Sequence, residues 1–123
     1  MKLRLRKNSL RLRVNQREVE SLAGGAILTE EVLFPGEARM LYILEPSNQT
    51  SPEASFIAGV LRVAAPEDQL REWANNDSVG IYFDLPANGT SLRVAIEKDL
   101  ECADASPEVR DPHAFPRTIG KNC

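Results

Sequence analysis

The chain has 123 residues, of which 42% are hydrophobic and 27% are charged, and its formal net charge is −3. This length fits a single domain and excludes a two-domain enzyme with a separate cofactor lobe. The apolar runs fall far short of the roughly 18 residues that a membrane-spanning helix needs. No apolar stretch of the kind found in signal peptides follows the basic start, so we expect a cytoplasmic protein that does not act at a membrane.

The net charge hides an uneven distribution along the chain. Residues 1–17 contain only basic charged side chains and carry +7, whereas the remaining residues carry −10. Such asymmetry is typical of a segment that binds an anion, or of a strand face that pairs with acidic neighbours.

The first 25 residues predict a strand hairpin followed by a helix. Leucines alternate with arginines in residues 3–6 and 10–14, which indicates two half-buried strands with the arginines on the opposite face. Asn15 is a favoured N-cap, and Glu18 stands three residues later, as a capping box requires. Gly24-Gly25 then ends the helix.

The rest of the chain predicts more strands and a second helix. Pro66 suits the first position of that helix, which carries an apolar stripe of Leu70, Trp73 and Ala74. Asn88-Gly89 is a strong signal for a hairpin turn. The strands are expected at about 26–34, 39–45, 54–63, 78–84 and 91–97, with the polar residues 46–53 as a link between halves.

The two halves have the same order of expected elements, and the apolar stripe of the first helix recurs in the second at an offset of 51 residues. We predict one α+β domain over residues 1–99, with about seven mostly antiparallel strands in a barrel or open sheet and two short helices. We also predict an internal pseudo-twofold repeat of residues 1–46 and 54–99. Two amphipathic helices that align by chance are the alternative.

Residues 100–123 differ from the rest because Pro107, Pro112 and Pro116 interrupt any regular element. We expect an irregular C-terminal tail that packs on the domain, with Phe115 docked against it.

Residues suited to catalysis or metal binding are few. The chain has one histidine, His113, and a dyad with Cys102 is disfavoured because Glu101 and Asp104 would raise the pKa of that thiol. Neither a glycine-rich phosphate loop nor closely spaced pairs of metal ligands occur. We therefore predict no catalytic site, no cofactor and no metal.

Glu97, Lys98 and Asp99 close the last expected strand. A mechanism with paired carboxylates needs one raised pKa, and the ammonium of Lys98 acts in the opposite direction. We interpret these residues as a solvated strand end. An enzyme that combines them with Cys102 and His113 is the least favoured hypothesis.

The basic hairpin has two interpretations. Such a ribbon can enter a major groove, where arginine suits guanine edges and phosphates. Alternatively, the arginines pair with acidic side chains of neighbouring strands, such as Glu31 or Glu97. The −10 charge of the remaining chain favours pairing over nucleic-acid binding. The arginines concerned are Arg4, Arg6, Arg11 and Arg13.

The sequence resembles a family of small bacterial proteins of unknown function, which implies a bacterial origin and a stand-alone domain. The resemblance also places Glu97, Lys98, Asp99 and Cys102 in a family pattern. The segments that carry it are Met1–Leu12, Gln16–Val19, Ile96–Cys102 and Ala114–Pro116.

A second, partial resemblance rests on Asn8–Val14, which precedes a short helix. This segment is similar to the AbrB/MazE type of swapped-hairpin DNA-binding domain, whose basic arm contacts DNA. The resemblance implies that the chain is a fused pseudo-dimer of such a domain, although Lys7 stands where that family usually has glycine and the second half lacks a basic arm.

We therefore expect a non-enzymatic binding or interaction domain without a cofactor, with an unknown protein partner or a second copy as its target. A DNA-binding regulator of AbrB/MazE type is the alternative.

Overall fold

The computed structural model describes residues 1–100 and 112–116. These residues form eight strands, two α-helices and a short 3₁₀ helix. The elements in chain order are β1 (Lys2–Arg6), β2 (Ser9–Val14), α1 (Gln16–Ala23), β3 (Leu28–Leu33), η1 (Pro35–Glu37), β4 (Arg39–Ser47), β5 (Glu53–Ile57), β6 (Val60–Pro66), α2 (Glu67–Ala74), β7 (Gly80–Ala87) and β8 (Thr90–Lys98).

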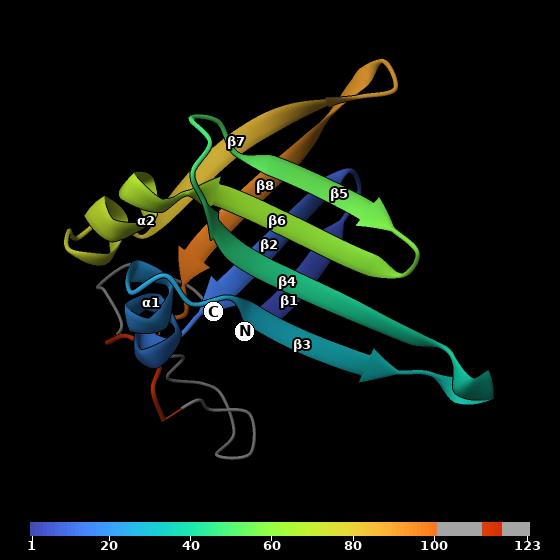
Figure 1. The fold of residues 1–123 in the computed structure, drawn as a ribbon, viewed down its shortest axis with the longest axis horizontal. Helices are drawn as coiled ribbons and strands as arrows, with labels where there is room; N and C mark the ends of the chain where they lie inside the picture. Colours follow the sequence, from blue (N-terminus) through green and yellow to red (C-terminus); the bar gives the residue numbers. More distant parts are fainter. Residues whose placement is uncertain (101–111, 117–123) are drawn as a thin grey trace.

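The strands make two four-stranded sheets. The first sheet has the order β1-β2-β8-β7, and the second has the order β3-β4-β6-β5. Each sheet consists of two antiparallel hairpins that meet in a central parallel pair, β2–β8 or β4–β6. The sheets lie face to face with their strands crossing, and both helices lie at one end (Figure 1). The α+β class is therefore confirmed, but the strands form two sheets and do not close into a barrel.

The period-two pattern explains the core. Because successive side chains point to opposite faces of a strand, each sheet has one apolar face, and these faces pack against each other. The apolar stripes of both helices close one end of this core. The largest fully buried side chains are Leu12, Val14, Leu22, Leu44, Val63, Leu70, Val94 and Ile96.

Helix α1 begins as the sequence predicts. The Asn15 side chain accepts a hydrogen bond from the Glu18 amide, and the Glu18 carboxylate accepts one from the Asn15 amide, both at 2.9 Å. This capping box satisfies amide groups that the first helical turn leaves unpaired. No helix in residues 1–100 and 112–116 has the length and hydrophobicity to cross a membrane.

The second half departs from the prediction at residues 54–63. Two strands, β5 and β6, replace the one expected strand, and Ala58 and Gly59 form the turn between them. Both residues adopt positive φ, 51° and 79°, as a tight hairpin turn requires, but alanine rarely does so. Pro66 ends β6 and caps α2, so the helix begins at Glu67 and not at the proline.

Several elements of the first half have a counterpart at a constant distance along the chain. Strand β1 and β5, α1 and α2, and β4 and β8 each start 51 residues apart. The polar link is shorter than expected, because β4 continues to Ser47 and β5 begins at Glu53. The proposed domain limits and the repeat itself stay predictions.

Residues 112–116 contact the two-sheet body. Phe115 packs against the hydrophobic core, and its amide donates to the Asp99 carbonyl at 2.7 Å. The His113 carbonyl accepts a hydrogen bond from the Gln16 amide at 2.9 Å. The expected docking of Phe115 is therefore observed, while the rest of the predicted tail, residues 101–111 and 117–123, lies outside the described residues.

Candidate anion-binding face

The outer face of the first sheet gathers basic side chains into one surface, which we call the arginine face. The strand registers place its residues in three rows that run from β1 across β2 and β8 to β7. The rows are Lys2–Arg13–Glu97–Gly80, Arg4–Arg11–Ala95–Tyr82 and Arg6–Ser9–Arg93–Asp84.

As predicted, the four arginines of the hairpin share one face of the sheet because of this register. They are Arg4, Arg6, Arg11 and Arg13. Arg4 stands directly opposite Arg11, and Lys2 stands opposite Arg13. Like charges directly opposite each other on antiparallel strands are unfavourable for folding. The register therefore brings like charges close together, and their repulsion has to be offset by nearby carboxylates or by an external anion.

Carboxylates on β7 and β8 neutralise part of this charge. Glu97 is the main partner: its carboxylate lies 3.0 Å from Nε of Arg11 and 3.7 Å from Nε of Arg13. Arg93 lies 3.8 Å from Asp84, and both are exposed. Among residues 1–100 and 112–116, Arg4 and Arg6 have no acidic side chain within ion-pair distance.

Glu31 and Glu97 are the predicted partners of the arginine hairpin. Glu97 does pair with Arg11 and Arg13. Glu31 does not reach this surface, because it lies on the second sheet, where it pairs with Arg39 at 3.2 Å.

Tyr82 lies on the arginine face beside Glu97. Its hydroxyl donates a hydrogen bond to the Glu97 carboxylate at 2.6 Å. Burial of the hydroxyl, and then the bond to Glu97 and its negative charge, raise the pKa of Tyr82 to about 12. The ring is nevertheless 61% exposed. Tyr82 is therefore a neutral, fixed aromatic side chain on a basic surface.

Gly80 makes room for this arrangement. A β-carbon at position 80 would lie 2.8 Å from the Tyr82 hydroxyl oxygen, 2.9 Å from Cγ of Glu97 and 2.9 Å from the Ile96 carbonyl oxygen. The absence of a side chain lets the tyrosine extend along its own strand towards Glu97.

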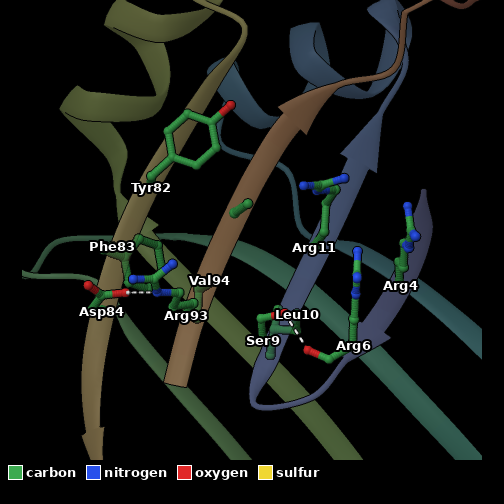
Figure 2. A pocket seen from close by; sticks show the side chains of 11 residues that line it. Arg4, Arg6, Ser9, Leu10, Arg11, Tyr82, Phe83, Asp84, Arg93 and Val94 are labelled. Carbon is green, nitrogen blue, oxygen red and sulfur yellow. Dashed lines mark hydrogen bonds and ion pairs between the residues drawn. The ribbon is translucent and has the colours of Figure 1, made fainter. Parts of the chain in front are cut away.

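A shallow concavity of about 480 Å³ lies between the arginines and Tyr82. The small side chains of Ser9 and Ala95 are among those that line it. Arg4, Arg6, Arg11 and Arg93 stand around it (Figure 2). Guanidinium groups on a concave surface suit oxyanions, because each can donate two parallel hydrogen bonds to carboxylate or phosphate oxygens.

The interpretation of Glu97, Lys98 and Asp99 as a solvated strand end is wrong. Lys98 and Asp99 are only 8% and 4% exposed. They are buried because β8 is a central strand and its end is covered by Trp73 of α2 and by Phe115.

The charges of these two residues are satisfied locally. The Lys98 ammonium donates to the Asn76 carbonyl at 2.6 Å and lies 5.7 Å from the centre of the Trp73 ring. Burial lowers the pKa of this ammonium, while the Asp77 carboxylate raises it. Asp99 pairs with Lys2 at 2.7 Å. These contacts indicate a structural role at the sheet end.

The remaining sequence candidates do not form a site in the described residues. His113 lies near the start of α1, and Cys102 falls outside the described residues. Residues 1–100 and 112–116 contain no cluster of histidine, cysteine and carboxylate side chains suited to a metal.

Gly80, Tyr82 and Arg93 belong to this face but are not predicted from the sequence. All three lie on β7 and β8, which join the hairpin through the parallel β2–β8 pair. Local periodicity could place Tyr82 and Arg93 on outward positions of their strands, but it carries no signal for a pairing between residues about 80 positions apart.

The chain matches a known family model. The model of a family described as "Family of unknown function (DUF7009)" matches residues 1–118. The match agrees with the first resemblance and lends no support to the AbrB/MazE resemblance. Neither the curated proteins nor the solved structures contain a match to this chain.

Proposed function

The chain belongs to the DUF7009 family, whose function is unknown, and we propose that it is a non-enzymatic domain that binds an anionic partner through its arginine face. The carrying observation is that Arg4, which stands directly opposite Arg11, and Arg6 have no acidic side chain within ion-pair distance among residues 1–100 and 112–116, whereas Lys2, Arg11 and Arg13 do. An external anion is therefore the natural counterpart of the charge on Arg4 and Arg6.

The local balance of charge supports the proposal. Six basic residues occupy the three rows of the arginine face, against the carboxylates of Asp84 and Glu97 in those rows and that of Asp99, which pairs with Lys2. The acidic excess of the chain lies elsewhere, and the outer face of the second sheet has Arg39 and Arg62 paired with Glu31 and Glu45. An anion is therefore attracted to the first sheet. On the second sheet, the charges of Arg39 and Arg62 are already neutralised by ion pairs.

The proposal does not include catalysis on this surface. The raised pKa of Tyr82 keeps its hydroxyl protonated at neutral pH, which makes it a poor base and a poor nucleophile. The Ser9 hydroxyl donates to the Arg6 carbonyl at 2.6 Å and has no base beside it on the face. Binding is the role that these groups support best.

We also propose that the domain arose by internal duplication. The equal spacing of β1 and β5, of α1 and α2, and of β4 and β8 supports this origin. So does the sheet topology, in which β1-β2-β8-β7 becomes β5-β6-β4-β3 when the halves are exchanged. On this view, one copy kept or acquired a basic outer face and the other did not.

Salt-dependent retention on immobilised heparin tests the proposed function, because heparin is a polyanion without aromatic groups. The double variant Arg4→Ala/Arg6→Ala should elute at clearly lower salt than the unmodified chain. The matched control Arg39→Ala/Arg62→Ala removes the same charge from the second sheet and should elute later than the first variant. Equal elution of the two variants would overturn the proposal.

A further inference from the structure

We infer that the anionic partner is a single-stranded nucleic acid, and that Tyr82 is the platform on which one of its bases stacks. This inference rests on the proposed binding role of the arginine face. It adds the chemical class of the partner, because the face combines phosphate-binding groups with a fixed, exposed aromatic ring.

Tyr82 is held in the position that stacking requires. Its hydroxyl is tied to Glu97 at 2.6 Å, and the missing side chain of Gly80 allows the ring to lie along the strand. The ring is seen broadside over the sheet in Figure 2 and is 61% exposed. A base can therefore cover the ring without first ordering it.

The arginines lie where a backbone that continues from that base would pass. Arg11 and Arg4 share the row of Tyr82, and Ala95 leaves the space between Tyr82 and Arg11 open. Arg93 and Arg6 stand in the next row, which is about 6.8 Å away along the strands because two residues separate the rows. Successive phosphates of an extended strand can therefore meet successive guanidinium groups.

Other anionic partners use less of this surface. A peptide rich in Asp and Glu would engage the arginines but supplies no flat ring for Tyr82. In duplex DNA the bases are stacked on each other, so they are not accessible to a tyrosine that lies flat on a sheet. The tyrosine is therefore the feature that distinguishes a single strand from both.

The overall negative charge does not oppose this binding strongly. Charges further apart than the Debye length, about 8 Å at physiological salt, are largely screened from each other. The acidic residues on the outer face of the second sheet are separated from the arginine face by two sheets that pack about 10 Å apart. A phosphate on the arginine face therefore senses mainly the local basic groups.

Fluorescence anisotropy with a labelled twelve-nucleotide deoxythymidine strand tests the inference. The unmodified chain should bind the strand more tightly than a duplex of the same length. Tyr82→Ala should weaken binding at least about five-fold, because base–aromatic stacking contributes on that scale. Tyr82→Phe keeps the ring but loses the bond to Glu97, so its affinity should lie between those of the unmodified chain and Tyr82→Ala. The control Phe56→Ala removes an equally exposed ring from the second sheet and should change nothing.

The salt dependence gives an independent readout. Each phosphate contact with a single strand contributes about −0.7 to the slope of log affinity against log salt. Arg4→Ala/Arg6→Ala should therefore make the slope shallower by about 1.4, whereas Tyr82→Ala should leave it unchanged.

The outcomes separate this inference from the proposed function. If the duplex or a polyglutamate peptide binds as tightly as the single strand, or if Tyr82→Ala has no effect, the single-strand inference is wrong while an anion-binding face stands. If Arg4→Ala/Arg6→Ala also leaves heparin retention unchanged, both are wrong. A thermal melt of each variant confirms that loss of binding does not reflect unfolding.

Discussion

The two sheets of this domain both have an apolar inner face, but their outer faces differ. Leu12 in the first sheet and Leu44 in the second are both fully buried in the common core. On the outside, the first sheet places Arg4 opposite Arg11, whereas the second pairs Arg62 with Glu45 at 2.9 Å.

This contrast distinguishes the inner faces, which the fold requires to be apolar, from the outer faces, whose residues can vary. The inner faces are fixed by burial, because each sheet must cover the other. The outer faces are free to diverge, and a surface ion pair such as that of Arg62 is worth at most about 1 kcal/mol. The charge on the first sheet is therefore the difference on which the proposed anion binding rests.

The largest loss of stability is expected from substitutions in the inner faces, where the two sheets are alike. Leu12→Ala and Leu44→Ala should each lower the free energy of unfolding by about 2–5 kcal/mol, because both leave a cavity in a fully buried position. Urea denaturation measures both values. A loss below about 1 kcal/mol in one variant alone would show that one sheet does not contribute its inner face to the core.

Gly80→Ala should have the next largest effect. Its β-carbon would approach the Ile96 carbonyl oxygen to 2.9 Å, and this backbone atom cannot easily move. We expect a loss of about 1–3 kcal/mol in stability, together with displacement of Tyr82. Gly24→Ala is the matched control, because its nearest atoms lie at 3.5 Å, and it should change stability by about 0.5 kcal/mol or less. Equal losses in both variants would contradict the packing described for Gly80.

Titration of Tyr82 should change stability at alkaline pH. Its pKa is about 12 in the folded chain and about 10 in an unfolded chain, so the folded state holds the proton more tightly. The resulting stability is fully present below pH 10 and is lost as the pH rises towards 12. The unfolding free energy of the unmodified chain should therefore fall more steeply over this window than that of Tyr82→Phe. Parallel curves would show that neither burial nor the bond to Glu97 raises the pKa of Tyr82 in the folded chain.

The smallest change in stability is expected from substitutions of the surface arginines. Arg39→Ala/Arg62→Ala removes two ion pairs and should cost up to about 1 kcal/mol of stability. Arg4→Ala/Arg6→Ala should cost nothing or give a small gain, because it relieves repulsion from Arg11. Thermal denaturation of both variants at low salt measures the difference. A larger loss from Arg4→Ala/Arg6→Ala would mean that the fold uses these two side chains.

The sequence predicts those elements whose formation depends on residues close together in the chain. The alternation in β1 and β2 and the capping box of Asn15 and Glu18 depend on spacings of two and three residues. The β5–β6 hairpin was missed because its turn places Ala58 at positive φ, a conformation that alanine does not signal. Its strands were therefore merged into one.

The site was predicted only in part, for a similar reason. The four arginines of the hairpin are visible as an alternating pattern, but Tyr82 and Arg93 join them through the parallel β2–β8 pair. Periodicity within a strand does not specify its neighbour in the sheet. Nor could it show that Lys98 and Asp99 are buried, because Trp73 and Phe115 reach them from distant segments.

The most direct test of the binding face is a nuclear magnetic resonance titration of the isotope-labelled chain with the deoxythymidine strand. We predict that the amide shifts of Arg4, Arg11, Tyr82 and Arg93 on the first sheet will change. The amides of Arg39 and Arg62 on the second sheet should stay unchanged. Shifts confined to the second sheet, or spread equally over both sheets, would contradict this prediction.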